Sequence, residues 1–266
     1  MSSPPEQETL RRVTAHLIVP GPGGPTLHGT RVLFGQDPVT LIRELGGLAS
    51  AVPLTAVDVL TQLVPAPGGR RMHIDRLVFA EPDHRALWPR VAAEAEPAPA
   101  PVDLADEEDL PPGAVPRLRR FASYGIVTDP AGRILLSRIA EGFPGAGTWH
   151  LPGGGVDPGE DARAALRREI REETGQHGAV GELITVASHR RTPPDGPDIY
   201  AVWVFSHVHV SRPCVPSVVE VGGSTCDCGW FTPEQIVNLR LSTTARRGLE
   251  FLAAAPEGPG SGGLGA

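Results

Sequence analysis

Three glutamates stand three and four residues apart in the second half of the chain. Glu169, Glu172 and Glu173 fall at positions i, i+3 and i+4, so a helix there would bring three carboxylates to one face. They also crowd the C-terminal turns, where the helix dipole favours cations, at a cost on the order of 0.3–1 kcal/mol for each acid. A divalent cation, Mg²⁺ or Mn²⁺, would relieve this repulsion because clustered carboxylate oxygens are its preferred ligands.

A solvated charged face is the simpler explanation of such a cluster. Arg167, Arg168 and Arg171 lie among the acids, and a pair such as Arg168 with Glu172 would account for one or two of them. A third converging carboxylate is left unexplained by that interpretation. The spacing therefore favours a metal site.

A glycine-rich loop, Trp149 to Gly155, directly precedes this segment. Consecutive glycines let the backbone approach a ligand or metal closely, where a side chain would block it. Alone the loop indicates no more than a turn. Together with the acids, the loop forms a sequence motif that is specific enough to compare with a known family.

The residues from Gly154 to Gln176, GGVDPGEDARAALRREIREETGQ, resemble the Nudix box, G-x5-E-x7-R-E-U-x-E-E-x-G-U with U apolar. Eight fixed positions are filled, by Gly154, Glu160, Arg168, Glu169, Ile170, Glu172, Glu173 and Gly175. Gln176 departs from the pattern, because an apolar residue is usual there. The departure concerns the packing after the helix and leaves the acids untouched.

The resemblance implies a role for each matching residue. The implied metal ligands are Glu172, Glu173, Glu169 and the carbonyl of Gly153. Glu169 would alternatively orient the attacking water, and Arg168 with Glu160 is similar to a salt bridge that supports the catalytic helix. Outside the box, Glu220 and Asp227 are candidates for a further acid, and Arg190 and Arg191 are candidates for substrate contact.

The implied activity is that of a magnesium-dependent pyrophosphohydrolase, in which metal-activated water attacks phosphorus. The substrate would be a nucleoside diphosphate linked to another group. ADP-ribose-like compounds, dinucleoside polyphosphates and oxidised nucleoside triphosphates all fit. Two other hypotheses stay open: a nucleotide-sensing regulatory protein without turnover, and a diphosphate isomerase on the same scaffold.

Several elements are needed to position these residues. Alternating apolar residues predict a hairpin over 122–139 with its turn at 129–132, and helical spacing predicts a helix over 160–173 that stops at Gly175. Strands are expected over 182–190 and 198–210, and helices are expected after the caps Thr232 and Ser242. The pattern predicts a mixed sheet covered by helices on both faces, and the resemblance implies that this is a Nudix α/β/α sandwich.

Composition divides the chain into four parts. An Ala/Pro-rich and acidic linker is expected over 93–116 and a disordered Gly-rich tail over 255–266. The hydrolase domain then spans 117–254, and a smaller α/β domain spans 9–92.

The smaller domain is interpreted as a degenerate copy of the larger one. Residues 11–24 and 119–132 share six identities in register, although chance similarity between two α/β segments is the alternative. The copy places Thr40, Leu41, Glu44 and Leu45 where the box has Arg168, Glu169, Glu172 and Glu173. We therefore expect it to lack hydrolase activity and to act as a packing partner, a dimerisation surface or a lid.

The net charge of −7 argues against nucleic-acid binding or binding to an anionic membrane by bulk electrostatics. No stretch reaches the roughly 20 apolar residues of a membrane span. We therefore expect a cytoplasmic protein that binds a small nucleotide-like diphosphate, and the sequence leaves a homodimer open.

Overall fold

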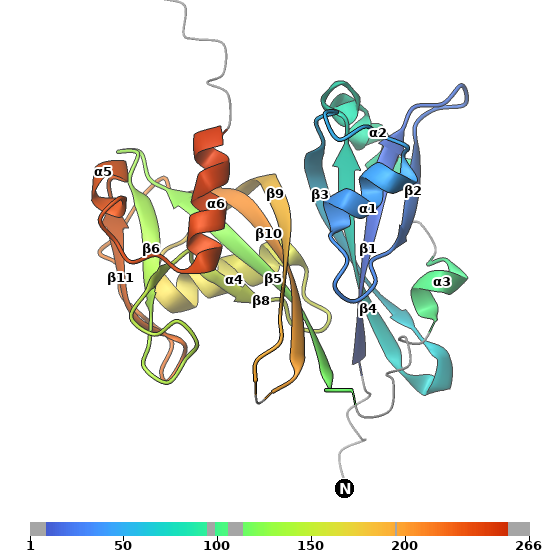
Figure 1. Cartoon of the computed structure of the whole chain (residues 1–266). Helices are drawn as coiled ribbons and strands as arrows, with labels where there is room; N and C mark the ends of the chain where they lie inside the picture. Colours follow the sequence, from blue (N-terminus) through green and yellow to red (C-terminus); the bar gives the residue numbers. More distant parts are fainter. Residues whose placement is uncertain (1–8, 95–98, 106–113, 195, 255–266) are drawn as a thin grey trace, which may run out of the picture.

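The computed structural model describes residues 9–94, 99–105, 114–194 and 196–254, and the expected tail at 255–266 lies outside them. The fold is α/β, built on two mixed β-sheets that lie side by side (Figure 1). The first sheet comes from the N-terminal third of the chain and the second from the rest. Strand β3 of the first sheet contacts strand β9 of the second.

The second sheet has seven strands. Their bounds are β5 Arg117–Thr128, β6 Ile134–Ile139, β7 Trp149–His150, β8 Gly153–Gly155, β9 Ala179–Arg191, β10 Asp198–His209 and β11 Thr225–Phe231. Three helices accompany it: α4 Ala162–Thr174, α5 Pro233–Ile236 and α6 Thr243–Ala254. The long path through the sheet runs β11-β6-β5-β10-β9, with β5 and β10 parallel.

The first sheet has four strands, in the order β2-β1-β4-β3. They are β1 Thr9–Val19, β2 Thr26–Arg31, β3 Thr55–Pro65 and β4 Arg71–Ala80. Helix α1, Pro38–Leu45, lies between β2 and β3 in the chain; the 3₁₀ turns η1 Pro67–Gly69 and η2 Pro82–Leu87 and the helices α2 Trp88–Glu94 and α3 Pro101–Leu104 complete this half.

The two sheets share one topology. The order β2-β1-β4-β3 corresponds strand for strand to β6-β5-β10-β9, with the central pair parallel and both outer pairs antiparallel in each sheet. In chain order, a helix also follows the second strand of each set and precedes the third. This helix is α1, between β2 and β3, in the first sheet, and α4, between β6 and β9, in the second. This correspondence is what a duplication would produce.

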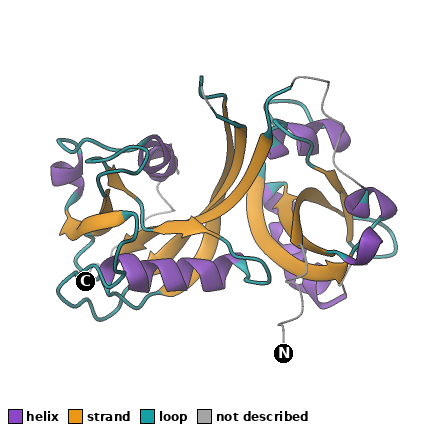
Figure 2. Ribbon diagram, turned by 90° about the horizontal axis from the view of Figure 1, so that it is seen from below, coloured by secondary structure: helices purple, strands orange, loops and turns teal. Residues whose placement is uncertain are grey.

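Helices α4 and α6 cover opposite faces of the second sheet, which gives the expected α/β/α sandwich (Figures 1 and 2). Strand β5 alternates between the two layers, since Val127 packs with Leu166 of α4 while Ile126 belongs to the cluster that contains Ala245 of α6. A third cluster joins the sheets directly, because it contains Val13 of β1 as well as Val202 of β10. The two halves therefore share a continuous apolar core.

The predicted hairpin and caps are confirmed. Asp129 closes the turn by accepting hydrogen bonds from the backbone N–H groups of Ala131 and Arg133. Thr232 caps α5, and the Ser242 hydroxyl accepts a hydrogen bond from the Ala245 N–H in the first turn of α6.

The catalytic helix begins later than its predicted start near residue 160. Asp161 is the N-cap, and its side chain accepts hydrogen bonds from the N–H groups of Arg163 and Ala164. Glu160 therefore lies in the loop before the helix. The predicted stop is confirmed, because Gly175 adopts the left-handed conformation with φ of 68°.

The described part of the expected linker packs against the first sheet. Asp103 of α3 is buried 3.6 Å from the Arg76 guanidinium, and the Ala105 carbonyl accepts a hydrogen bond from Arg12 at 2.6 Å. Composition predicted an extended spacer here. The difference arises because Arg12 and Arg76 are buried and need polar partners. Residues 106–113 lie outside the described parts of the chain.

Among the described helices, none is both long and apolar enough to cross a membrane.

We expect Gly175→Ala to destabilise the protein by about 1–2 kcal/mol, because alanine is strained at positive φ. An added Cβ would also lie 3.0 Å from the Ser217 hydroxyl. Gly132→Ala is the matched control, since φ is 74° there and nothing lies within 4 Å of the added atom. Urea unfolding should show the larger loss at Gly175, and equal losses would contradict the proposed contact with Ser217.

Candidate functional site

Strand β8 consists of three glycines, Gly153–Gly155, which we call the glycine corner, and it lies beside α4. Gly153 pairs with Tyr124 of β5 in an antiparallel register. Its φ is 139°, and an added Cβ would lie 2.2 Å from the Ser123 carbonyl oxygen. Only glycine fits this position, because any side chain would collide with the β5 backbone.

Arg168 lies at the centre of the acidic groups on α4. Its guanidinium contacts the carboxylates of Glu160 at 3.0 Å, Glu169 at 2.8 Å, Glu172 at 3.2 Å and Asp157 at 3.7 Å. It also donates to the Gly155 carbonyl at 3.1 Å. The predicted pair of Arg168 with Glu160 is present, and the same guanidinium also joins two of the predicted metal ligands.

Glu173 points into the protein. Its carboxylate accepts hydrogen bonds from the Gly153 N–H at 3.1 Å, the Thr225 hydroxyl at 2.8 Å and the Ser137 hydroxyl at 3.2 Å. Burial raises the pKa of Glu173 to about 7, although these three donors favour the charged form. Ser137 and Thr225 come from β6 and β11, so the sheet as well as the helix fixes this carboxylate.

The three glutamates therefore do not converge as the helical spacing predicted. Within the described ranges, no group of three His, Cys, Asp or Glu side chains is arranged to hold a metal ion. Arg168 draws Glu169 and Glu172 together, while Glu173 turns towards the backbone of Gly153. The Arg168 guanidinium offsets part of the negative charge of Glu169 and Glu172, and hydrogen-bond donors surround Glu173.

The acidic groups nevertheless suit a divalent cation. Glu169 lies against the backbone of Gly154, because a Cβ added to Gly154 would be 2.6 Å from its Oε1. Burial raises the pKa of Glu169; Arg168 opposes this effect, and the negative charges of Glu172 and Glu220 add to it. The site thus has more carboxylates than Arg168 neutralises, and all of them are hard oxygen donors.

Glu220 is held beside the helix by its backbone. Its N–H and that of Val219 both donate to the Glu172 carbonyl, at 3.0 and 2.8 Å. The Ser217 N–H donates to the Thr174 carbonyl in the same way. The loop between β10 and β11 thereby satisfies the free carbonyls at the end of α4 and brings a fourth acid to the site.

Gln176, the departure from the box pattern, anchors the start of this loop. The side chain is buried, and its amide nitrogen donates to the Thr174 and Cys214 carbonyls, both at 3.2 Å. Its amide oxygen accepts a hydrogen bond from the Cys214 N–H at 3.0 Å. An apolar residue would pack here but would not bind the loop.

The remaining predicted residues lie apart from one another. Arg190 is held by Asp198 at 2.6 Å, and its guanidinium lies 5.5 Å from the ring centre of Phe34, in the turn between β2 and α1. It therefore belongs to the contact between the two halves of the chain. Asp227 is exposed on β11, where it accepts a hydrogen bond from the Cys228 N–H. Arg191 lines a cleft beside the glycine corner.

This cleft consists of two adjoining cavities. One, of about 250 Å³, contains Gly153 and Glu173 in its lining; the other, of about 530 Å³, reaches Trp203. Both are lined by Arg120, Ile139, Pro144, His150 and Arg191. Glu173 and Gly153 thus lie at one end of a cleft that is large enough for a nucleotide.

Sequence reasoning did not single out the other groups in the cleft. Arg120 is exposed at its wall, and the His189 ring stacks on Trp203 with ring centres 5.4 Å apart. Burial lowers the pKa of His150 to about 4, so this imidazole is neutral at pH 7. Arg119 and Arg120 are adjacent on β5, so strand alternation sends their side chains to opposite faces of the sheet, and this signal could have marked one of them as a cleft residue.

Known proteins match the second half of the chain. A family model described as NUDIX domain matches residues 118–252. The chain is 36% identical over 130 residues to the nucleoside triphosphatase NudI of Escherichia coli O1:K1, covering 45% of this chain and 87% of the relative. The same protein of Escherichia coli O9:H4 (strain HS) gives the same identity and coverage.

Two solved structures match about half of the chain. The MutT NUDIX hydrolase of Burkholderia pseudomallei is 30% identical, with a TM-score of 0.41, covering 51% of this chain and 98% of its own. The NUDIX domain of Shewanella oneidensis NrtR, complexed with ADP ribose, is 17% identical with a TM-score of 0.44, covering 52% and 88%.

The fold and the site together define a hydrolase with a carboxylate-bearing helix beside a glycine strand. The chain belongs to the Nudix family and acts on acid anhydrides in phosphorus-containing compounds.

We expect Gln176→Leu to destabilise the protein by about 2 kcal/mol, because the Cys214 N–H and the Thr174 carbonyl lose their partner. Hydrogen exchange over residues 214–220 should also become faster. Cys214→Ala is the control, since it removes the Sγ contact and keeps the backbone bonds to Gln176. An equal effect of both substitutions would show that the amide does not anchor the loop.

Proposed function

We propose that this protein is a magnesium-dependent pyrophosphohydrolase that cleaves the diphosphate linkage of a nucleotide. One observation carries the proposal: several carboxylates of α4 lie beside the glycine strand β8, and one of them, Glu173, lines a cleft together with Arg120 and Arg191. Such a site can hold a cation at one end and phosphate oxygens next to it.

Glu169, Glu172, Glu173 and the Gly153 carbonyl would hold the magnesium ion. When bound, the ion neutralises charge on the diphosphate oxygens and lowers the pKa of water at the site. Arg168 would keep Glu169 and Glu172 in place, with Glu160 fixing the guanidinium. We assign Glu220, which lies near Glu169, as the further acid outside the box.

A nucleoside triphosphate suits the cleft best among the substrates considered. Two arginines beside the acids offer forked donors to a chain of phosphates, and Trp203 with His189 offers an aromatic surface for a base. The name of the curated relatives, nucleoside triphosphatase, supports the same substrate class.

We further propose that residues 9–92 form a degenerate Nudix-like domain without hydrolase activity and that 117–254 form the hydrolase domain. The matching strand order supports a common origin. Helix α1 carries Thr40, Leu41 and Leu45 where α4 carries Arg168, Glu169 and Glu173, so it lacks the acids a cation would need. A cytoplasmic location, a homodimer and the absence of nucleic-acid binding stay predictions.

Glu172→Gln should lower kcat by several orders of magnitude and leave the fold intact, because it removes a proposed cation ligand and no core contact. The assay is a panel of nucleoside triphosphates and nucleoside diphosphate derivatives with Mg²⁺, with products identified by mass spectrometry. From the preferred triphosphate and one water molecule we expect a nucleoside monophosphate and inorganic pyrophosphate.

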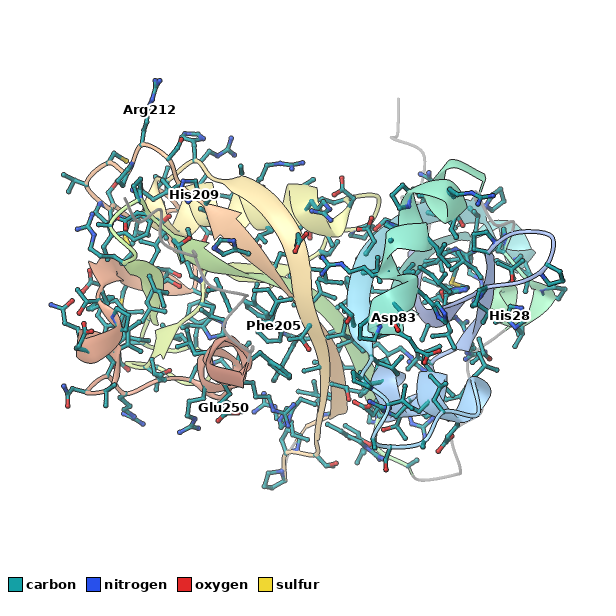
Figure 3. The ribbon with its side chains drawn as sticks, turned by 90° about the horizontal axis from the view of Figure 1, so that it is seen from above. His28, Asp83, Phe205, His209, Arg212 and Glu250 are labelled. Atoms are coloured by element: carbon teal, nitrogen blue, oxygen red, sulfur yellow. The ribbon has the colours of Figure 1, made fainter. Side chains whose placement is uncertain are left out.

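Glu250→Gln is the matched control. Glu250 is exposed on the outer side of α6, whereas Phe205 lies on the sheet beneath that helix (Figure 3). The control should retain full turnover. A rearranged diphosphate would indicate an isomerase, and binding of unchanged nucleotide would indicate a sensor; either result would replace the hydrolase proposal.

Arg191→Met and Arg120→Met should each raise KM for the preferred triphosphate about tenfold or more, because a charged hydrogen bond to phosphate is lost. Arg212→Met is the control, since Arg212 points away from the molecule into solvent (Figure 3). Steady-state kinetics at fixed Mg²⁺ would test this. Unchanged KM in both cleft variants would place the phosphates elsewhere.

A further inference from the structure

The loop that precedes the catalytic helix is held by side chains of the first sheet. Arg11 of β1 donates a hydrogen bond to the Val156 carbonyl. At the other end of the loop, the Gly159 N–H donates to His73 Nδ1 at 3.0 Å. The contacts come from strands β1 and β4, and they join residues that are 145 and 86 positions apart in the chain.

Asp75 joins the two contacts. Its carboxylate lies 3.1 Å from the Arg11 guanidinium and 3.1 Å from His73 Nε2. Because Nδ1 accepts the hydrogen bond from Gly159, the ring proton must lie on Nε2 and is donated to Asp75. The Thr61 hydroxyl donates to the same carboxylate at 3.2 Å. One buried aspartate therefore sets the tautomer of His73 and the orientation of Arg11.

These groups are shielded from water. The side chains of His73 and Asp75 are 0% exposed, and that of Arg11 is 17% exposed. Val156 is buried as well, in the cluster that also contains Val13 and Leu77 of the first sheet. Hydrogen bonds to charged groups in such surroundings are strong, and a lost partner is costly.

The loop leads directly to the acids. Glu160 follows Gly159, and its carboxylate accepts hydrogen bonds from Arg168 Nε at 3.1 Å and from Arg168 NH2 at 3.0 Å. Arg168 in turn contacts Glu169 and Glu172. A displacement of the loop would move Glu160, and the guanidinium that orders the acids would lose its main support.

We infer that the first sheet positions the catalytic loop, with His73 and Arg11 as positioning residues that act through Gly159, Val156 and Glu160. This inference rests on the proposed function of the acids. It gives the N-terminal domain a role that a plain packing partner lacks. Apolar side chains would suffice for packing, and they would not fix two polar backbone groups on either side of residues 157 and 158.

His73→Ala should lower kcat about tenfold and leave KM within about twofold, since the substrate cleft lies elsewhere. Hydrogen exchange of the backbone over residues 156–160 should become faster in the same variant, with or without Mg²⁺. Compared with His73→Ala, His73→Asn should retain much more of the kcat of the unsubstituted protein. The asparagine Oδ1 can accept the hydrogen bond from the Gly159 N–H close to the position of the His73 Nδ1.

Val78→Ala is the matched control. Val78 lies on the same strand but packs with Ile18 and Val91, away from the loop. It should lower the unfolding temperature and keep kcat and the loop exchange of the parent protein.

Two results would overturn the inference. The first is a His73→Ala variant whose kcat and whose hydrogen exchange over residues 156–160 equal those of the unsubstituted protein. The second is an equal fall of kcat in Val78→Ala, which would mean that kcat follows the stability of the first sheet and not the contact with the loop. An inactive parent protein would instead refute the proposed hydrolase, and the exchange measurement would still decide whether the first sheet holds the loop.

Discussion

Repulsion among the carboxylates of one helix is the constraint on which the site depends. Arg168 balances part of it by contacting Glu160, Glu169 and Glu172 at once. Glu173 turns away from the other two, towards the backbone of Gly153. There, two hydroxyls and one N–H donate hydrogen bonds that offset the cost of burying its carboxylate. The negative charge that remains is what suits the site to a cation.

Parts of the chain far from the helix maintain this arrangement. The loop before β11 is tied to the end of α4 through Gln176, and it brings Glu220 beside Glu169. Arg11 and His73 of the first sheet form hydrogen bonds with the backbone of the loop before α4. Both ends of the catalytic helix are thus fixed by polar contacts with segments that the Nudix box does not contain.

The two halves show how one topology can serve different purposes. Both sheets have the same strand order, and a helix occupies the same place in each. In the first half this helix has eight residues and is capped by Asp37, and in the second it has thirteen. Without the acids, the first helix has no charge repulsion to balance, and the strands next to it supply contacts to the second half instead.

Local sequence determined the hairpin, the helix stop at Gly175 and the set of acids, because turns, caps and helical spacing depend on neighbouring residues. Tertiary structure alone decided where the side chains point. Helical spacing put Glu173 beside Glu169 and Glu172, but hydroxyls from two distant strands draw it inward. Arg190 and Arg191 are adjacent in sequence, yet strand alternation and the Asp198 carboxylate send only Arg191 to the cleft. The roles of Arg120 and His73 depend on which strands meet, and hydrogen bonds between residues so far apart in the chain leave no pattern that a single sequence reveals.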